Sequence, residues 1–221
     1  MPRRFDLPQG GTAWARYVER MSHLLLVYGT VDGQTGRIAQ EMARVLRRAG
    51  HDVTVRPASL PHAADDAGVF DGVIVGAGIR YGHYPKYLAP LVRHCVKPLD
   101  VPTAFFSVCL SAGGPGARPA TAQAYVDDFL RKTEWRPDAV QSFAGALLYR
   151  RYNVFIRFMM RMIVGFAGGD TDTSRDYEYT DWAAVTRFAE TFGKTSVRDR
   201  PQRLRPRFSP AARTTPLSRQ A

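Results

Sequence analysis

Length, composition and charge limit the classes of protein to which this chain can belong. Its 221 residues suffice for one α/β domain with a core of ordinary size. No run of about 20 apolar residues is present, and the N-terminus lacks the apolar segment of a signal peptide. We therefore expect neither a membrane-spanning helix nor export, and we place the protein in the cytoplasm.

The cysteines and histidines argue against a metal site. The separation of Cys95 and Cys109 fits neither a zinc motif nor a redox pair, and the five histidines are scattered along the chain. We expect no metal and interpret both thiols as packed apolar side chains.

The formal net charge of +11 is concentrated at the two ends of the chain. Residues 194–221 hold eight Lys or Arg, one Asp and several prolines without apolar periodicity, and residues 1–20 carry a net +2. Both segments are predicted to be disordered, with Met21 as an alternative start, which leaves a nearly neutral domain at 21–193. We expect no nucleic-acid partner and interpret the tail as a solvated extension; contact with anionic lipid or nucleic acid is the alternative.

The first predicted element is a strand that leads into a helix through a hydroxyl-rich loop. Residues 24–27 form an apolar run typical of a strand buried on both faces, and apolar residues recur at helical spacing from Ile38. Between them lie Thr30, Asp32, Gly33, Gln34 and Thr35. Hydroxyls and N–H groups at a helix N-terminus bind anions, so this loop is a candidate phosphate site. An ordinary capped turn is the alternative.

Two common nucleotide motifs do not fit this loop. A Walker loop needs Gly-Lys-Ser/Thr at the start of the helix, whereas the chain has GQT at 33–35. A dinucleotide fingerprint needs GxGxxG after the first strand. The nearest match, GAG at 76–78, follows a later strand and has Tyr81 at the third glycine position.

The remaining predicted elements alternate strands with helices. Hydrophobic patterns predict strands at 51–56, 72–77, 101–108 and 139–148 and helices at 84–97 and 120–131. A last helix follows Thr180, its predicted N-cap, with the apolar stripe Trp182, Val185, Phe188, Ala189 and Phe192. These units predict a doubly wound α/β fold, in which a five-stranded parallel sheet has helices on both faces.

Ligands bind such sheets beyond the carboxyl ends of the strands, where the strand order reverses. Three loops border that place, at residues 29–35, 77–84 and 107–116. Tyr81, His83 and Tyr84 in the second loop are suited to stacking on a planar group, with an ordinary surface turn as the alternative. His83 is the one histidine in these loops and is a weak candidate for proton transfer; a hydrogen-bonded loop histidine is the alternative.

Several motifs resemble those of known proteins. TVDGQT at 30–35 resembles the FMN phosphate loop of the flavodoxin superfamily, with Asp32 in place of a hydroxyl residue. A narrower likeness rests on DGQT at 32–35, IRYGHY at 79–84, FFSVCL at 105–110, WRPD at 135–138, AGAL at 144–147, RYNVFIRFM at 151–159, GGDTDT at 168–173 and YTDW at 179–182. With these motifs in order over residues 21 to 192, the chain resembles the quinone-dependent protoporphyrinogen oxidases.

The resemblance implies a flavodoxin-like fold with strand order 2-1-3-4-5, a long insertion after or within the fifth strand, and an FMN cofactor. The family oxidises protoporphyrinogen IX to protoporphyrin IX in haem biosynthesis and passes electrons to a membrane quinone, menaquinone or ubiquinone. Cofactor contacts are then expected at Thr30, Val31, Asp32, Gly33, Gln34, Thr35, Ala77, Gly78, Ile79, Arg80, Tyr81, Ser107, Val108, Cys109 and Leu110.

The predicted insertion, at 149–173, distinguishes the chain from a short flavodoxin. Residues 149–169 are apolar and contain no acidic residue, and on a helix Arg150, Arg157 and Arg161 would form one stripe beside a broad apolar face. Such a helix suits the membrane interface and predicts a peripheral protein on the inner face of the cell membrane. Together with Arg151, these arginines are candidates to bind the substrate carboxylates. Packing on its own domain or on a dimer partner is the alternative.

Two other functions stay open from the sequence. A flavodoxin-type electron carrier shares the fold and the cofactor, but it typically has an acidic docking face, whereas this core is nearly neutral. The second alternative is a membrane-associated reductase that transfers electrons from NAD(P)H to quinone, although no dinucleotide loop supports it. The oligomeric state, including a homo-oligomer, is also left open.

Overall fold

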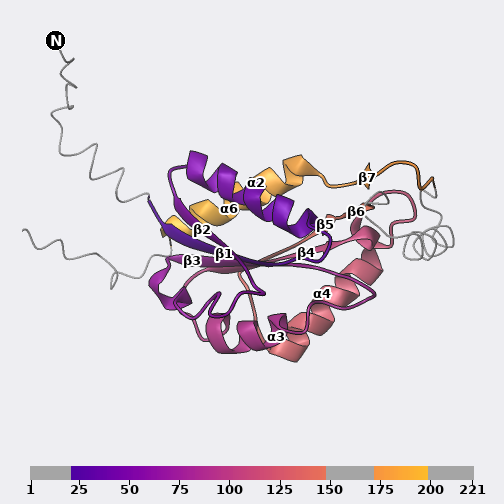
Figure 1. Ribbon diagram of the computed structural model, residues 1–221. Coiled ribbons are helices and arrows are strands. Elements are labelled where there is room, and N and C mark those ends of the chain that lie inside the picture. Colours follow the sequence, from indigo (N-terminus) through magenta and orange to yellow (C-terminus); the bar gives the residue numbers. More distant parts are fainter. Residues whose placement is uncertain (1–20, 148–171, 199–221) are drawn as a thin grey trace, which may run out of the picture.

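A sheet of five parallel strands forms the centre of the computed structural model, which describes residues 21–147 and 172–198 (Figure 1). The strands are β1 (His23–Gly29), β2 (Asp52–Pro57), β3 (Gly72–Gly78), β4 (Thr103–Cys109) and β5 (Ala139–Ala144). Their spatial order is β2-β1-β3-β4-β5, and each neighbouring pair is parallel. The predicted flavodoxin-like sheet is confirmed.

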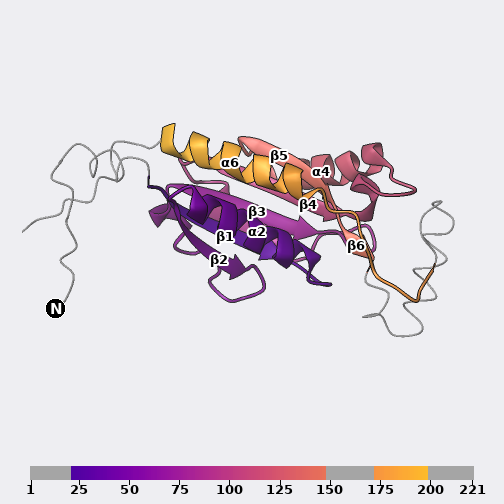
Figure 2. The same ribbon diagram turned by 90° about the horizontal axis from the view of Figure 1, so that it is seen from above.

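Helices cover both faces of this sheet. Figure 2 shows α2 (Gln34–Arg48) and α6 (Trp182–Arg198) side by side on one face. Figure 1 shows α3 (Leu88–Leu91) and α4 (Pro119–Thr133) on the other. Short helical segments are η1 (Ala67–Val69), η2 (Val92–Val96) and η3 (Leu110–Ala112). The helix predicted at 84–97 is shorter, and its second half has the wider π-helical form. Pro85 and Pro90 lack N–H donors, which limits regular hydrogen bonding in this stretch.

Alternate residues of β1 face opposite sides of the sheet. Leu24 and Leu26 pack in the cluster under α2 and α6, whereas Leu25 and Val27 pack in the cluster under α3 and α4. All four side chains are fully buried. The continuous apolar run in the sequence is therefore explained by a central strand with helices on both sides.

Packing between β3 and β4 depends on one glycine. Gly76 is the register partner of Phe106, and a Cβ built at Gly76 would lie 1.9 Å from the Phe106 ring. The Phe106 side chain is fully buried. The missing side chain of Gly76 thus provides the space in which the ring lies.

The WRPD motif at 135–138 joins the starts of β4 and β5. The Trp135 indole N–H donates to the Thr103 hydroxyl at 3.3 Å, and the Asp138 carboxylate accepts the Thr103 backbone N–H at 2.7 Å. Trp135 is also buried, with its ring centroid 5.8 Å from that of Phe105. This motif lies at the amino end of the sheet and supports the fold.

The fifth strand is shorter than the predicted span of 139–148. It ends at Ala144, and β6 (Ala146–Leu147) leaves the sheet to pair antiparallel with β7 (Tyr177–Glu178). Gly145, between the two strands, donates its N–H to the Cys109 carbonyl at 3.3 Å and accepts the Tyr179 N–H at 3.2 Å. These two hydrogen bonds replace regular strand pairing at the point where the chain turns.

The predicted N-cap of α6 needs correction. Thr180 is not its N-cap, because the Asp181 carboxylate accepts the Ala184 N–H at 3.0 Å while the Thr180 hydroxyl donates to the Ala144 carbonyl. At its other end α6 continues to Arg198. Ser196 in this last part is fully buried, next to Gly72, so tertiary packing extends the helix into a segment of tail-like composition.

Candidate functional site

A cavity of about 240 Å³ lies at the carboxyl edge of the sheet, among the loops that follow β1, β3 and β4. This is the place that the strand order predicts for a ligand. All but three of the residues predicted to contact the cofactor line the cavity. The exceptions are Gly33, Ala77 and Ser107.

Those three exceptions have simple structural reasons. Ala77 and Ser107 are fully buried within their strands, where their side chains face the protein interior. The Ser107 hydroxyl accepts a hydrogen bond from the Tyr84 hydroxyl at 2.8 Å. Gly33 belongs to the first loop, but it shapes the backbone there instead of facing the cavity.

The first loop is closed by a hydrogen bond within itself. The Gly33 N–H donates to the Thr30 hydroxyl oxygen at 2.9 Å, and Gly33 has the left-handed backbone conformation, with φ of 92°. Glycine adopts this conformation without the steric penalty that a Cβ brings. The DGQT sequence thus turns the chain directly from β1 into α2.

The N-terminus of α2 is suited to an anion. The first-turn N–H groups of a helix have no acceptor within it, and the dipole of this 15-residue helix adds partial positive charge. No acidic residue lies in that turn. Asp32 lies just before it, but its carboxylate is 3.5 Å from the Arg80 guanidinium, which offsets its charge. The carboxylate that replaces a hydroxyl in this loop is therefore compatible with a phosphate.

The backbone of β3 closely approaches the first turn of α2. A Cβ built at Gly78 would lie 2.6 Å from the Thr35 hydroxyl oxygen, and Thr35 itself is buried. Because Gly78 has no side chain, the cavity continues from the start of α2 to the loop after β3. Its residues therefore fit FMN, a long molecule with a phosphate at one end and a planar ring at the other.

The second loop contains a tight turn that directs Tyr81 outward. Arg80 and His83 exchange two backbone hydrogen bonds of 3.0 and 3.1 Å, and φ is 51° at Tyr81 and 81° at Gly82. Positive φ at both central residues is typical of a type I′ turn. The Tyr81 side chain is 56% exposed at the cavity, and the Arg80 guanidinium lies 5.1 Å from its ring centroid.

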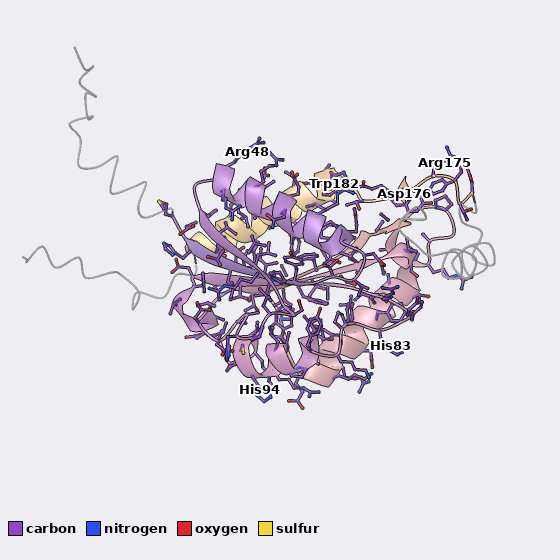
Figure 3. All side chains as sticks on the ribbon, in the orientation of Figure 1. Arg48, His83, His94, Arg175, Asp176 and Trp182 are labelled. Atoms are coloured by element: carbon purple, nitrogen blue, oxygen red, sulfur yellow. The ribbon has the colours of Figure 1, made fainter. Side chains whose placement is uncertain are left out.

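The other aromatic candidates of this loop lie outside the cavity lining. The Tyr84 ring packs against Phe105 and Phe129, with centroid separations of 5.7 and 5.0 Å, and burial raises the pKa of its hydroxyl. Figure 3 shows His83 on the α4 side of the sheet, where it is exposed. The turn reverses the chain before His83, so the structure does not bring this candidate for proton transfer into the cavity.

The third loop places a buried thiol in the cavity wall. Cys109 is 6% exposed, and burial raises the pKa of its thiol, which keeps it neutral. Farther along the third loop, Gly114 has φ of 87° and lies against the Tyr179 ring. A Cβ built at Gly114 would be 2.7 Å from that ring.

The other cysteine, Cys95, is only partly buried, and its thiol donates to the Asp65 carboxylate at 3.8 Å.

Sequence reasoning missed part of the cavity wall. Tyr125 of α4 lines it, although the sequence predicts only a helix there. Gly145 and Ala146 also line it, where a strand was predicted. The signal that could have identified these two was the AGAL motif at 144–147, since a motif beyond the end of a strand lies at the ligand edge. Gly82 and Ser111 complete the lining from within the predicted loops.

The predicted substrate arginines cannot be placed. Arg150, Arg151, Arg157 and Arg161 lie outside the described residues, as does most of the insertion predicted at 149–173. Among the helices of the described ranges, none is long and apolar enough to cross a bilayer. Within those same ranges, no group of three or more His, Cys, Asp or Glu side chains is arranged to hold a metal.

Comparisons with known proteins identify the chain's relatives. Residues 25–174 match the model of a flavodoxin domain family. The protoporphyrinogen IX dehydrogenase [quinone] of Escherichia coli strain K12 is 38% identical over 168 residues, which cover 75% of this chain and 91% of that protein. The protein of the same name from Leishmania major is 39% identical over 173 residues, covering 76% of this chain and 73% of that protein. Oxidised flavodoxin 1 of Bacillus cereus superposes with a TM-score of 0.48 at 17% identity, over 78% of this chain and 98% of that chain.

Proposed function

We propose that this chain, which belongs to the family of quinone-dependent protoporphyrinogen IX dehydrogenases, oxidises protoporphyrinogen IX to protoporphyrin IX and passes the electrons to a membrane quinone. The observation that carries the proposal is the identity shared with the Escherichia coli enzyme over most of that enzyme's length. The cavity at the carboxyl edge of the sheet supports it, because the loops predicted to hold a flavin line that cavity.

FMN is the cofactor, and the first loop and the α2 N-terminus hold its phosphate. The Thr30 and Thr35 hydroxyls and the first-turn N–H groups of α2 supply the donors, and the Asp32–Arg80 pair keeps the loop close to neutral. The second and third loops, with Tyr81 and Cys109, would flank the FMN ring. Bound FMN would supply a two-electron acceptor between porphyrinogen and quinone, and the six-electron oxidation to protoporphyrin IX would take three such transfers.

The mouth of the cavity is suited to a flat and poorly soluble macrocycle. Val31 and Tyr81 are 52% and 56% exposed at its edge, and their apolar surfaces can cover a porphyrinogen ring. The neutral Cys109 thiol keeps charge away from the cofactor ring. For the substrate carboxylates we propose Arg150, Arg151, Arg157 and Arg161, from the sequence alone.

The membrane surface is the proposed place of action. The quinone lies in the bilayer, and the basic and apolar segment 149–169 suits the lipid interface. Replacing the four arginines of this segment together should weaken liposome binding and raise the KM for porphyrinogen. If both measurements stayed at their wild-type values, this part of the proposal would be wrong.

The test is an anaerobic assay of FMN-loaded protein with protoporphyrinogen IX and a quinone, followed by porphyrin fluorescence. We expect a rate that depends on quinone and exceeds spontaneous oxidation. A protein that fails here but reduces quinone with NAD(P)H is a reductase, and one that only exchanges electrons with a redox protein is a carrier.

Two tyrosines of the second loop region provide a matched pair of variants for this assay. Tyr81→Ala should raise the KM for porphyrinogen about tenfold, since its aromatic face is lost. Tyr87→Ala should leave the KM unchanged, because Tyr87 is also exposed but does not line the cavity.

A further inference from the structure

Gln34 stands at the first position of α2, within the phosphate loop, yet its side-chain amide faces a distant part of the chain. The side chain is only 5% exposed. Its amide nitrogen donates to the Thr180 hydroxyl oxygen at 2.8 Å and to the Glu178 carboxylate at 3.1 Å. Glu178 is the last residue of β7 and Thr180 lies between β7 and α6, so both acceptors are more than 140 residues away along the chain.

Further hydrogen bonds complete this network. Arg37, one turn along α2, donates to the Gln34 amide oxygen at 3.0 Å and to the Glu178 carboxylate at 2.9 Å. The Arg37 guanidinium also lies 5.6 Å from the ring centroid of Trp182, which Figure 3 shows on the same face of the sheet as α2. A buried amide with partners for its oxygen and its nitrogen is held in one orientation.

The far end of the network reaches the cavity wall. The Thr180 hydroxyl donates to the Ala144 carbonyl at 3.0 Å, and the next residue, Gly145, lines the cavity. The Tyr179 N–H donates to the Gly145 carbonyl, and the Gly145 N–H donates to the Cys109 carbonyl. A chain of hydrogen bonds therefore joins the start of α2 to the opposite wall.

We propose that Gln34 is a positioning residue that couples occupation of the phosphate loop to the order of residues 177–180 and of the wall at Gly145. A bound anion would accept hydrogen bonds from the first turn of α2, and the Gln34 side chain starts from that same turn. An anion that orders this turn therefore also orders the Gln34 amide and its partners at 178 and 180. Coupling is reciprocal, so the same network tightens FMN binding. The inference rests on the FMN site of the proposed function but not on the identity of the oxidised substrate.

Gln34→Met tests the coupling, because methionine has a similar length and cannot form these hydrogen bonds. FMN affinity, measured by quenching of flavin fluorescence, should fall about tenfold, as expected when buried hydrogen-bonding groups lose their partner. Riboflavin lacks the phosphate, so its affinity should change about threefold or less. Gln40→Met is the matched control on the exposed side of the same helix and should change neither affinity.

Hydrogen exchange distinguishes coupling from a purely structural role of Gln34, because only coupling predicts that FMN protects one region and not the other in the variant. In the wild-type protein and in Gln40→Met, FMN should slow amide exchange at 177–180. In Gln34→Met this effect should disappear while FMN still slows exchange at 79–81. If Gln34→Met does not fold, Thr180→Val removes the hydroxyl at the other end of the link and should give the same pattern.

Two results would overturn the inference. The first is equal FMN-induced protection of 177–180 in Gln34→Met and wild type, and the second is an equal loss of FMN and riboflavin affinity. With wild-type FMN binding intact, either result leaves the proposed function standing. A wild-type protein that does not bind FMN would overturn both proposals.

Discussion

The middle of the sheet and its carboxyl edge are held together by different interactions. In the middle, Leu25, Phe105 and Phe106 are fully buried among apolar neighbours, and close packing decides the structure. At the edge, a few directional contacts decide it, such as the Asp32–Arg80 ion pair and the Gln34 amide. Changes in the middle should therefore lower stability, whereas changes at the edge should alter ligand binding at smaller cost to the fold.

The largest effect is expected in the middle of the sheet, at Phe106. Phe106→Ala should lower the free energy of unfolding by about 3–5 kcal/mol, because it leaves a cavity between fully buried side chains. Gly76→Ala alone should cost about 1–3 kcal/mol, since its Cβ would overlap the ring. Urea unfolding of both variants and of the double variant gives the coupling between the two sites.

The double variant sharpens this prediction. The new methyl group at position 76 partly fills the space that the ring leaves, so the combined loss should be smaller than the sum of the single losses. Additive losses would show that Gly76 and Phe106 do not share this space.

The next effect is expected at the edge, at Gly33. Gly33→Ala forces a side chain into a backbone with φ of 92°, which should cost about 1–2 kcal/mol of stability and about tenfold in FMN affinity. Gly50→Ala is the matched control, because φ is 95° there and its Cβ would meet nothing within 4 Å. It should show a similar loss of stability and unchanged FMN affinity. Equal FMN affinities in Gly33→Ala and Gly50→Ala would show that the backbone at Gly33 does not contribute to phosphate binding.

A smaller effect is expected from the partly exposed pair of Asp32 and Arg80. Asp32→Asn removes a negative charge beside the phosphate and should tighten FMN binding a few-fold, or about 0.5–1 kcal/mol, whereas Arg80→Gln should weaken it by a similar factor. Both effects should shrink in high salt, because screening reduces interactions between exposed charges. FMN titrations at low and high ionic strength measure this, and changes of the same sign in the two variants would contradict the charge argument.

The smallest effect is a pH dependence of stability at the amino end of the sheet. Burial lowers the pKa of His51, and its Nδ1 has no hydrogen-bond partner among the described residues. The unfolded chain, with a histidine pKa of about 6.5, then binds the proton more readily than the folded chain. Stability should fall as the pH drops from about 6.5 toward the lower folded pKa.

Urea unfolding of His51→Gln over this pH range checks the assignment. Its slope with pH should be shallower than that of the wild type, whereas exposed His94→Gln should keep the wild-type slope. An unchanged slope in His51→Gln would assign the pH dependence to other groups.

Much of the fold could be predicted because its signals are local. The apolar run at 24–27 and the helical spacing from Ile38 depend on neighbours in sequence, so they predict β1 and α2 directly. The N-cap of α6 was predicted wrongly because two adjacent residues can both fill that position. Thr180 and Asp181 can both cap a helix, and only packing shows that Thr180 faces Gln34 while Asp181 caps α6. The position of His83 outside the cavity lining could not be predicted either, since it depends on a turn with positive φ at Tyr81 and Gly82.

The sequence by itself determined the alternation of strands and helices and the hydroxyl-rich start of α2, because these follow from periodicity and from residues close in the chain. The strand order, and with it the place of the three loops, came from the resemblance to a known family. Only the tertiary structure decided that Gly76 makes room for Phe106, that Arg80 pairs with Asp32, and that the Gln34 amide binds Thr180. Each of these contacts joins residues far apart in sequence. They form only after the helices have packed on the sheet, so no local pattern of residues encodes them.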